Sequence, residues 1–194
     1  MDRQYDSMPP IHQGATMAGT EVESGVEQQW IIERLWSGEP ARQAERVQLS
    51  FRLESQSLHV HVQAPHHGDR APAGPPGAFP GLWDYEVVEL FLLAEPDHYL
   101  EIELGPHGHH WVLELHGRRQ VAREGLPIRY QAQRADGRWT GRAEIPRDYL
   151  PAKVVRGNGY AIHGTGAPRR YLARFPVAGT APDFHRLDCF GPLG

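Results

Sequence analysis

The chain has 194 residues, a single cysteine and a net charge of −4, from 24 acidic and 20 basic side chains. This length fits one domain whose core needs no cross-links, and a lone cysteine excludes an intrachain disulfide, which favours a reducing, cytoplasmic location. The basic residues are scattered, the N-terminus has no basic segment followed by an apolar run, and no apolar stretch reaches ~18 residues, so we expect no nucleic-acid partner, no signal peptide and no membrane span.

The first part of the chain divides into an arm and three strands. Residues 1–27 are polar, rich in Gly, Pro and Ser and without periodicity, so we expect a flexible arm followed by one domain over residues 28–194. Alternating apolar residues predict strands over 28–36, 47–53 and 58–64. The last two are separated by a short polar turn, which predicts a hairpin with a polar outer face.

The most regular alternation predicts a central hairpin, formed by residues 86–93 and 99–104. Apolar side chains alternate there with Glu89, Glu101 and Glu103. We therefore expect the three carboxylates on adjacent strands, on the face turned away from the apolar core.

The remaining strands complete an all-β pattern. We expect a strand at 110–115, a hairpin of 128–134 and 138–145 across an Asp-Gly turn, a helical turn at 146–150, and strands at 159–166 and 170–175. In the strand at 110–115, the alternation predicts that Trp111, Leu113 and Leu115 face the core and that His110 faces the opposite side. Nine to eleven short strands without a helix-period run favour a single all-β sandwich of two sheets.

Histidines and carboxylates on this pattern suggest a metal site. His59 and His61 are two apart on one strand and therefore share a face. A carboxylate from a nearby strand, for which Glu101 is the candidate, would complete a set of ligands for a divalent metal. The alternative is a solvated sheet face on which Glu and His side chains pair.

Trp83 is a candidate ligand platform. It follows residues 65–82, an 18-residue loop with five prolines and four glycines, and loops this long are often functional. An exposed indole there would stack on the C–H face of a sugar, whereas the alternative is a Trp that plugs the end of the sandwich. The other tryptophans alternate within predicted strands and are expected to be buried or half-buried: Trp30, Trp36, Trp111 and Trp139.

The stretch WDYEVVELFL at 83–92 resembles the signature of family 9 carbohydrate-binding modules, which belong to the DOMON-like β-sandwiches. The likeness continues in YLEIELGP at 99–106, RAEIP at 142–146 and FGPL at 190–193, and so extends over most of the predicted domain. The chain is also similar to a family of small, uncharacterised intracellular proteins that share its LWD, GPHG and DFHRL stretches. The resemblance implies a β-sandwich.

The resemblance also implies a ligand site. Sugar-binding members hold a sugar between two Trp, with a Glu, an Arg, an Asn and a Gln on its hydroxyls. Trp83 matches the first Trp and Glu89 the Glu, while Glu103 and His163 stand at the Arg and Gln positions. Phe184 lies near the position of the missing second Trp. These departures from the family pattern mean that the fold carries over better than the sugar specificity.

We therefore predict a non-catalytic module that binds a carbohydrate or another small polar ligand through Trp83, Glu89, Glu103, His163 and Phe184. One alternative is a metal-dependent enzyme that uses the His/Glu face, and another is an interaction protein without chemistry. Nucleophilic catalysis is disfavoured because the chain has no Gly-x-Ser-x-Gly motif and its only cysteine lies in an apolar C-terminal context.

Overall fold

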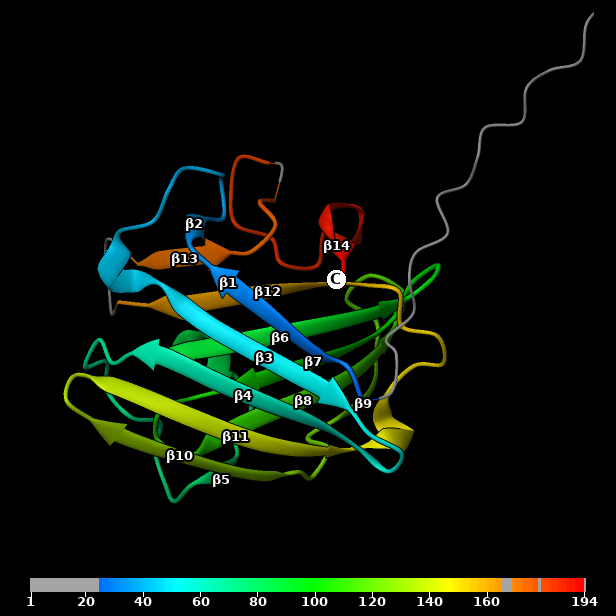
Figure 1. Cartoon of the computed structure of the whole chain (residues 1–194), viewed down its shortest axis with the longest axis horizontal. Coiled ribbons are helices and arrows are strands. Elements are labelled where there is room, and N and C mark those ends of the chain that lie inside the picture. The colour runs from blue at the N-terminus through cyan, green and yellow to red at the C-terminus, as the bar shows by residue number, and fades with distance from the viewer. Residues whose placement is uncertain (1–24, 165–168, 178, 194) are drawn as a thin grey trace, which may run out of the picture.

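The computed structural model describes residues 25–164, 169–177 and 179–193, which form two β-sheets packed face to face (Figure 1). The five-stranded sheet has the order β1 (Glu27–Ile32), β3 (Val47–Leu53), β4 (Ser57–Pro65), β11 (Arg138–Pro146) and β10 (Arg129–Ala135). The nine-stranded sheet has the order β2 (Arg34–Leu35), β13 (Arg170–Ala173), β12 (Arg156–His163), β6 (Val87–Ala94), β7 (His98–Leu104), β8 (His109–His116) and β5 (Gly77–Ala78). In the same sheet, β14 (Gly191–Pro192) pairs with β12, and β9 (Val121–Glu124) pairs with β8.

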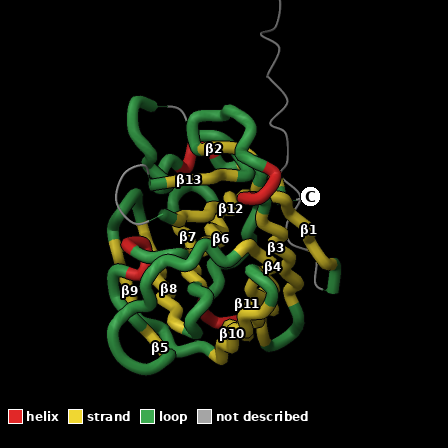
Figure 2. Tube along the Cα trace, turned by 90° about the vertical axis from the view of Figure 1, so that its left-hand side faces the viewer, coloured by secondary structure: helices red, strands yellow, loops and turns green. Residues whose placement is uncertain are grey.

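Figure 2 shows the two layers edge on, with β3, β4 and β11 in one and β7 and β8 in the other. The predicted all-β sandwich is thus confirmed. The helical segments of the described residues are four 3-10 turns: η1 (Gln43–Glu45), η2 (Leu82–Asp84), η3 (Arg147–Tyr149) and η4 (Leu187–Cys189). No helix in this part of the chain has the length and apolar character that crossing a membrane requires. Residues 1–24 of the predicted arm, and residues 165 and 166 of a predicted strand, lie outside the described residues.

The predicted hairpins form with the expected pairing. β3 pairs antiparallel with β4, and β10 pairs with β11 across Asp136 and Gly137. Both turn residues have positive φ, 52° and 70°, which matches the twist of a two-residue hairpin loop. The short strands β5 and β9 were not predicted, because two to four residues carry no readable alternation.

The main core lies between the two sheets. Its apolar side chains alternate along the central strands of both sheets, as Leu49 and Phe51 do on β3 and Leu90 does on β6. On β7, Ile102 points into the same core. Because neighbouring residues of a strand face opposite ways, the residues of β6 and β7 that alternate with Leu90 and Ile102 lie on the outer face of the nine-stranded sheet.

That outer face is itself covered, which alternation alone did not predict. Phe91, Tyr99 and Tyr160 form a second apolar cluster there, with Phe190 of the C-terminal segment packed on it. The nine-stranded sheet is therefore buried on both faces.

Strand β8 illustrates the consequence for the predicted faces. Val112 lies in the main core, whereas Leu113 and Leu115 belong to the second cluster and Trp111 packs against it. Our assignment of Trp111, Leu113 and Leu115 to the core between the sheets was wrong, and His110, on the same side as Val112, faces inward. Two apolar faces on one strand give no signal as to which one meets the second sheet.

Candidate functional site

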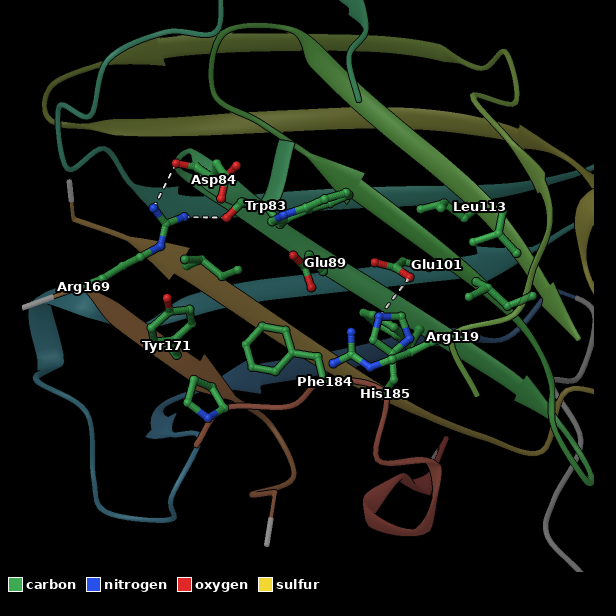
Figure 3. Close-up of a pocket in the computed structure, with 15 residues that line it drawn as sticks. Trp83, Asp84, Glu89, Glu101, Leu113, Arg119, Arg169, Tyr171, Phe184 and His185 are labelled. Carbon is green, nitrogen blue, oxygen red and sulfur yellow. Dashed lines mark hydrogen bonds and ion pairs between the residues drawn. The ribbon is translucent and has the colours of Figure 1, made fainter. Parts of the chain in front are cut away.

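A pocket of about 400 Å³ opens on the outer face of the nine-stranded sheet (Figure 3). Its floor comes from β6, β7, β8 and β12, and its walls come from the η2 turn, β13 and the C-terminal segment. Rings and charged groups both line it: Trp83, Tyr171, Phe184, His185, Glu89, Glu101, Arg119 and Arg169.

Three carboxyl groups lie together on the outer face of β6 and β7. Glu89 pairs directly with Glu103 in the antiparallel register, and Glu101 is the next outward residue of β7. The fractional exposures of Glu89, Glu101 and Glu103 are only 2%, 6% and 0%. The predicted adjacency of Glu89 and Glu103, facing away from the main core, is confirmed, but this face is buried and the expected solvated face was wrong.

Burial sets the protonation of these groups. Desolvation raises the pKa of Glu101 to about 8, because a charged carboxylate is disfavoured away from water. Desolvation and the neighbouring carboxyl groups hold the pKa values of Glu89 and Glu103 well above their ordinary range. Neither Glu103 oxygen makes a hydrogen bond of normal geometry within the described residues. At neutral pH the Glu101 carboxyl group is therefore largely protonated, and a protonated carboxyl group both donates and accepts hydrogen bonds.

His185 completes the floor as a neutral imidazole. Its Nε2 lies 3.8 Å from a Glu101 oxygen, and its Nδ1 lies 2.7 Å from the Tyr99 hydroxyl. Burial lowers the pKa of His185 to about 4. The Tyr99 hydroxyl accepts the Arg119 backbone N–H, so its own hydrogen is free for Nδ1, and the imidazole proton then sits on Nε2, facing Glu101.

Trp83 stands at the rim on the η2 turn, which begins after Gly81 in the left-handed conformation (φ 78°). Its side chain is 47% exposed, so it is not a plug of the sandwich. The Arg169 guanidinium donates to the backbone carbonyls of Trp83, Asp84 (2.9 Å) and Tyr85 (3.1 Å). This cation holds the turn, and with it the indole, in place.

Phe184 forms the facing wall. Its ring stacks flat on Tyr160, with centroids 3.9 Å apart and planes 5° from parallel. The Tyr160 hydroxyl donates to the Phe184 carbonyl (3.1 Å), which fixes the segment to the sheet. In Figure 3, the Glu89 carboxyl group lies between Trp83 and Phe184.

The structure therefore brings together most, but not all, of the predicted ligand residues. Trp83, Glu89 and Phe184 line the pocket, and Glu103 lies beside Glu89 beneath it. His163 does not belong to this group.

His163 instead faces the interior at the end of the sandwich. Its ring stacks on His67, with centroids 3.5 Å apart, and its Nε2 lies 3.4 Å from Glu45. The physical reason is strand alternation on β12, where Ile162 takes the pocket side and its neighbour must point the other way.

The predicted metal set is not assembled. His59 and His61 lie on β4 of the five-stranded sheet, whereas Glu101 lies on the nine-stranded sheet. Glu101 and the two histidines face outward from opposite layers, because Leu58 and Val60 of β4 and Leu100 and Ile102 of β7 fill the core between them. His59 instead contacts Ser57, at 2.9 Å.

Sequence reasoning missed the cations and His185 of the pocket. Arg119 binds Asp183, at 2.8 Å, and Arg169 reaches back to the Trp83 turn. These contacts join segments more than 60 residues apart, so no local spacing reveals them. The one available signal was that His185 directly follows Phe184, a residue already placed near the site.

No protein-family model matches the chain. The UPF0462 protein C4orf33 homolog of Danio rerio is 44% identical to it over 153 residues, covering 74% of this chain and 78% of that protein. The Mus musculus homolog is also 44% identical, over 171 residues, with 84% and 88% covered.

Two solved structures share the fold. A candidate carbohydrate-binding protein from Bacteroides uniformis aligns with a TM-score of 0.64 at 17% identity, covering 86% of this chain and 84% of that one. A family 9 carbohydrate-binding module from Caldicellulosiruptor kristjanssonii, in complex with cellotriose, aligns with a TM-score of 0.50 at 11% identity, covering 84% and 80%.

Proposed function

The chain belongs to the UPF0462 family, and we propose that this member binds a saccharide without transforming it, in the pocket between Trp83 and Phe184. One observation carries the proposal: an exposed indole and a facing phenyl ring flank a buried floor of carboxyl groups.

This combination matches the chemistry of a sugar. A pyranose has apolar C–H faces, which stack on aromatic rings, and a rim of hydroxyls that donate and accept hydrogen bonds. The Glu101 carboxyl group, largely protonated at neutral pH, offers both roles, and burial shifts the neighbouring Glu89 toward the same neutral form. A pocket of about 400 Å³ falls within the usual range for small-ligand sites.

The fold supports the same class of ligand, since it is shared with a module whose structure holds cellotriose. Because one fold can serve many functions, the ligand class is inferred from the residues that line the pocket.

The arrangement of the carboxyl groups supports binding over hydrolysis. A glycosidase places two carboxyl groups on either side of the scissile bond. Here Glu89, Glu101 and Glu103 lie side by side on one sheet face, and the opposing walls carry Trp83 and Phe184.

Calorimetric titration of the full chain with glucose, cellobiose and cellotriose tests the proposal. We expect saturable binding of at least one saccharide, roughly millimolar or about −4 kcal/mol, because stacking and a few hydrogen bonds must offset the cost of association. Trp83→Ala should abolish binding. Its effect on stability should be smaller than the ~3–5 kcal/mol that deletion of a core Trp costs, because nearly half of the indole is already exposed.

Trp36→Ala is the matched control, since Trp36 is half-buried and does not line the pocket. It should leave the affinity unchanged. A wild type with no saccharide response, or a Trp83→Ala variant that binds as well as the wild type, would contradict the proposal.

A further inference from the structure

A second group of chemistry-bearing side chains lies on the same sheet, away from the pocket. His98 of β7 stands directly opposite His116 of β8, and Glu114 is two residues before His116 on the same face. That face is the inward one, because Leu100 and Val112, which continue it, lie in the main core. The three residues therefore lie at the edge of the main core, where the inward side chains of β7 and β8 change from apolar to polar.

The ligand-type atoms of the three residues converge. Glu114 Oε1 lies 2.9 Å from His98 Nε2 and 3.1 Å from His116 Nε2. One nitrogen or oxygen from each residue falls within 4.8 Å of the others, and the two imidazole centroids are 4.0 Å apart. Three donors at this spacing can reach one ion with only small side-chain rotations.

Neighbouring groups orient the carboxylate. The Arg123 guanidinium of β9 binds the other oxygen of Glu114 and lies over the Tyr149 ring, 5.4 Å from its centroid. The Glu114 side chain is only 12% exposed. A largely buried carboxylate held in one orientation by a neighbouring cation is well placed to act as a metal ligand.

We propose that His98, Glu114 and His116 form a binding site for a divalent transition metal such as zinc or cobalt. Two imidazoles and a carboxylate suit these ions, whereas calcium and magnesium prefer oxygen ligands alone. His98 is half-buried and His116 is exposed, so one side of this group of three ligands is open to solvent. Water or an exogenous ligand would take the remaining coordination position of the metal. The site lies on the opposite face of the sheet from the saccharide pocket and does not depend on it.

Cobalt and zinc titrations of the untagged full chain, freed of metal by chelator, test the site. Visible absorption should show one Co²⁺ per chain, displaced by Zn²⁺. Each single ligand variant should bind cobalt at least ~10-fold more weakly than the wild type: His98→Ala, Glu114→Gln and His116→Ala. Changing a residue that only supports a metal ligand already lowers metal affinity ~10-fold or more, so removal of a ligand itself should cost at least as much. Zinc should also raise the melting temperature of the wild type, and raise it less in these variants.

His59→Ala is the matched control, because His59 is also a strand histidine close to a glutamate, Glu54 at 3.4 Å, but lies on β4 of the other sheet. It should leave cobalt binding and the zinc-dependent melting shift unchanged. Equal binding by wild type and the three ligand variants, or loss of the cobalt spectrum in His59→Ala, would overturn the proposal. A wild type that binds several cobalt ions weakly and without a defined spectrum would mean an adventitious ion only.

Discussion

The buried carboxyl floor makes stability depend on pH, and Glu101→Gln isolates that dependence. Glutamine keeps the size of the side chain but carries no ionisable proton. Glu101 ionises near pH 8 in the folded chain, against an ordinary value of 4.5. Between these values the folded chain binds the proton that the unfolded chain has released, so the free energy of unfolding falls as pH rises from 4.5 to 8.

The expected change in the free energy of unfolding follows from the difference between the two pKa values of Glu101. One pKa unit corresponds to 1.36 kcal/mol, so raising the pH from 4.5 to 7 removes roughly 3 kcal/mol of stability through Glu101 alone. The variant lacks this loss. It should approach the stability of the wild type near pH 5 and exceed it by roughly 2–3 kcal/mol at pH 7.

Urea unfolding at pH 5 and pH 7 measures the effect. Glu144→Gln is the control, since Glu144 lies on the outer surface of β11 in an ion pair with Arg129 at 3.0 Å and should change stability little at either pH. Parallel pH dependences of wild type and Glu101→Gln would refute the reasoning, because they would mean that the Glu101 carboxyl group ionises in the folded chain as it does in water.

Other contacts give further predictions. Arg169→Ala removes the clamp on the Trp83 turn and should weaken saccharide binding about tenfold in a calorimetric titration, as loss of ~1.5 kcal/mol of charged hydrogen bonding implies. Phe184→Ala should weaken binding by a similar factor, since one stacking wall is lost. Gly157→Ala should lower stability by ~3 kcal/mol or more in urea unfolding, because the added Cβ would lie 2.4 Å from the Phe91 carbonyl oxygen. Unchanged affinity in both pocket variants, or an unchanged unfolding midpoint in the glycine variant, would contradict these accounts.

The fold was predictable because alternation is a local property. It correctly predicted two long hairpins and the placement of Glu89 and Glu103 on adjacent strands, facing away from the main core. It failed where both faces of a strand are apolar, as around Trp111 and Leu113, because such a strand carries no sign of which face meets the second sheet. The burial of the carboxyl groups was not predicted either, because the C-terminal segment that covers this face is distant from β6 and β7 in sequence.

The site was predictable only where a residue could be placed by a local pattern or a resemblance. Trp83 and Glu89 were found in that way, whereas His163 was placed on the wrong side of its strand. The histidine-and-carboxylate pattern expected at His59 and His61 occurs instead at His98, Glu114 and His116. Spacing along one strand was readable, but the partner strand that completes the set depends on the topology of the sheets.

The central claim is that a saccharide binds between Trp83 and Phe184. Two-dimensional ¹H–¹⁵N NMR of the full chain during titration with cellotriose tests it most directly, with the Trp83 indole signal assigned by its loss in Trp83→Phe. The account predicts saturable shifts of the Trp83 indole N–H and of the amides of Glu89, Glu101 and Phe184, with the five-stranded sheet unaffected. An unmoved Trp83 indole signal, or shifts centred on another surface, would contradict it.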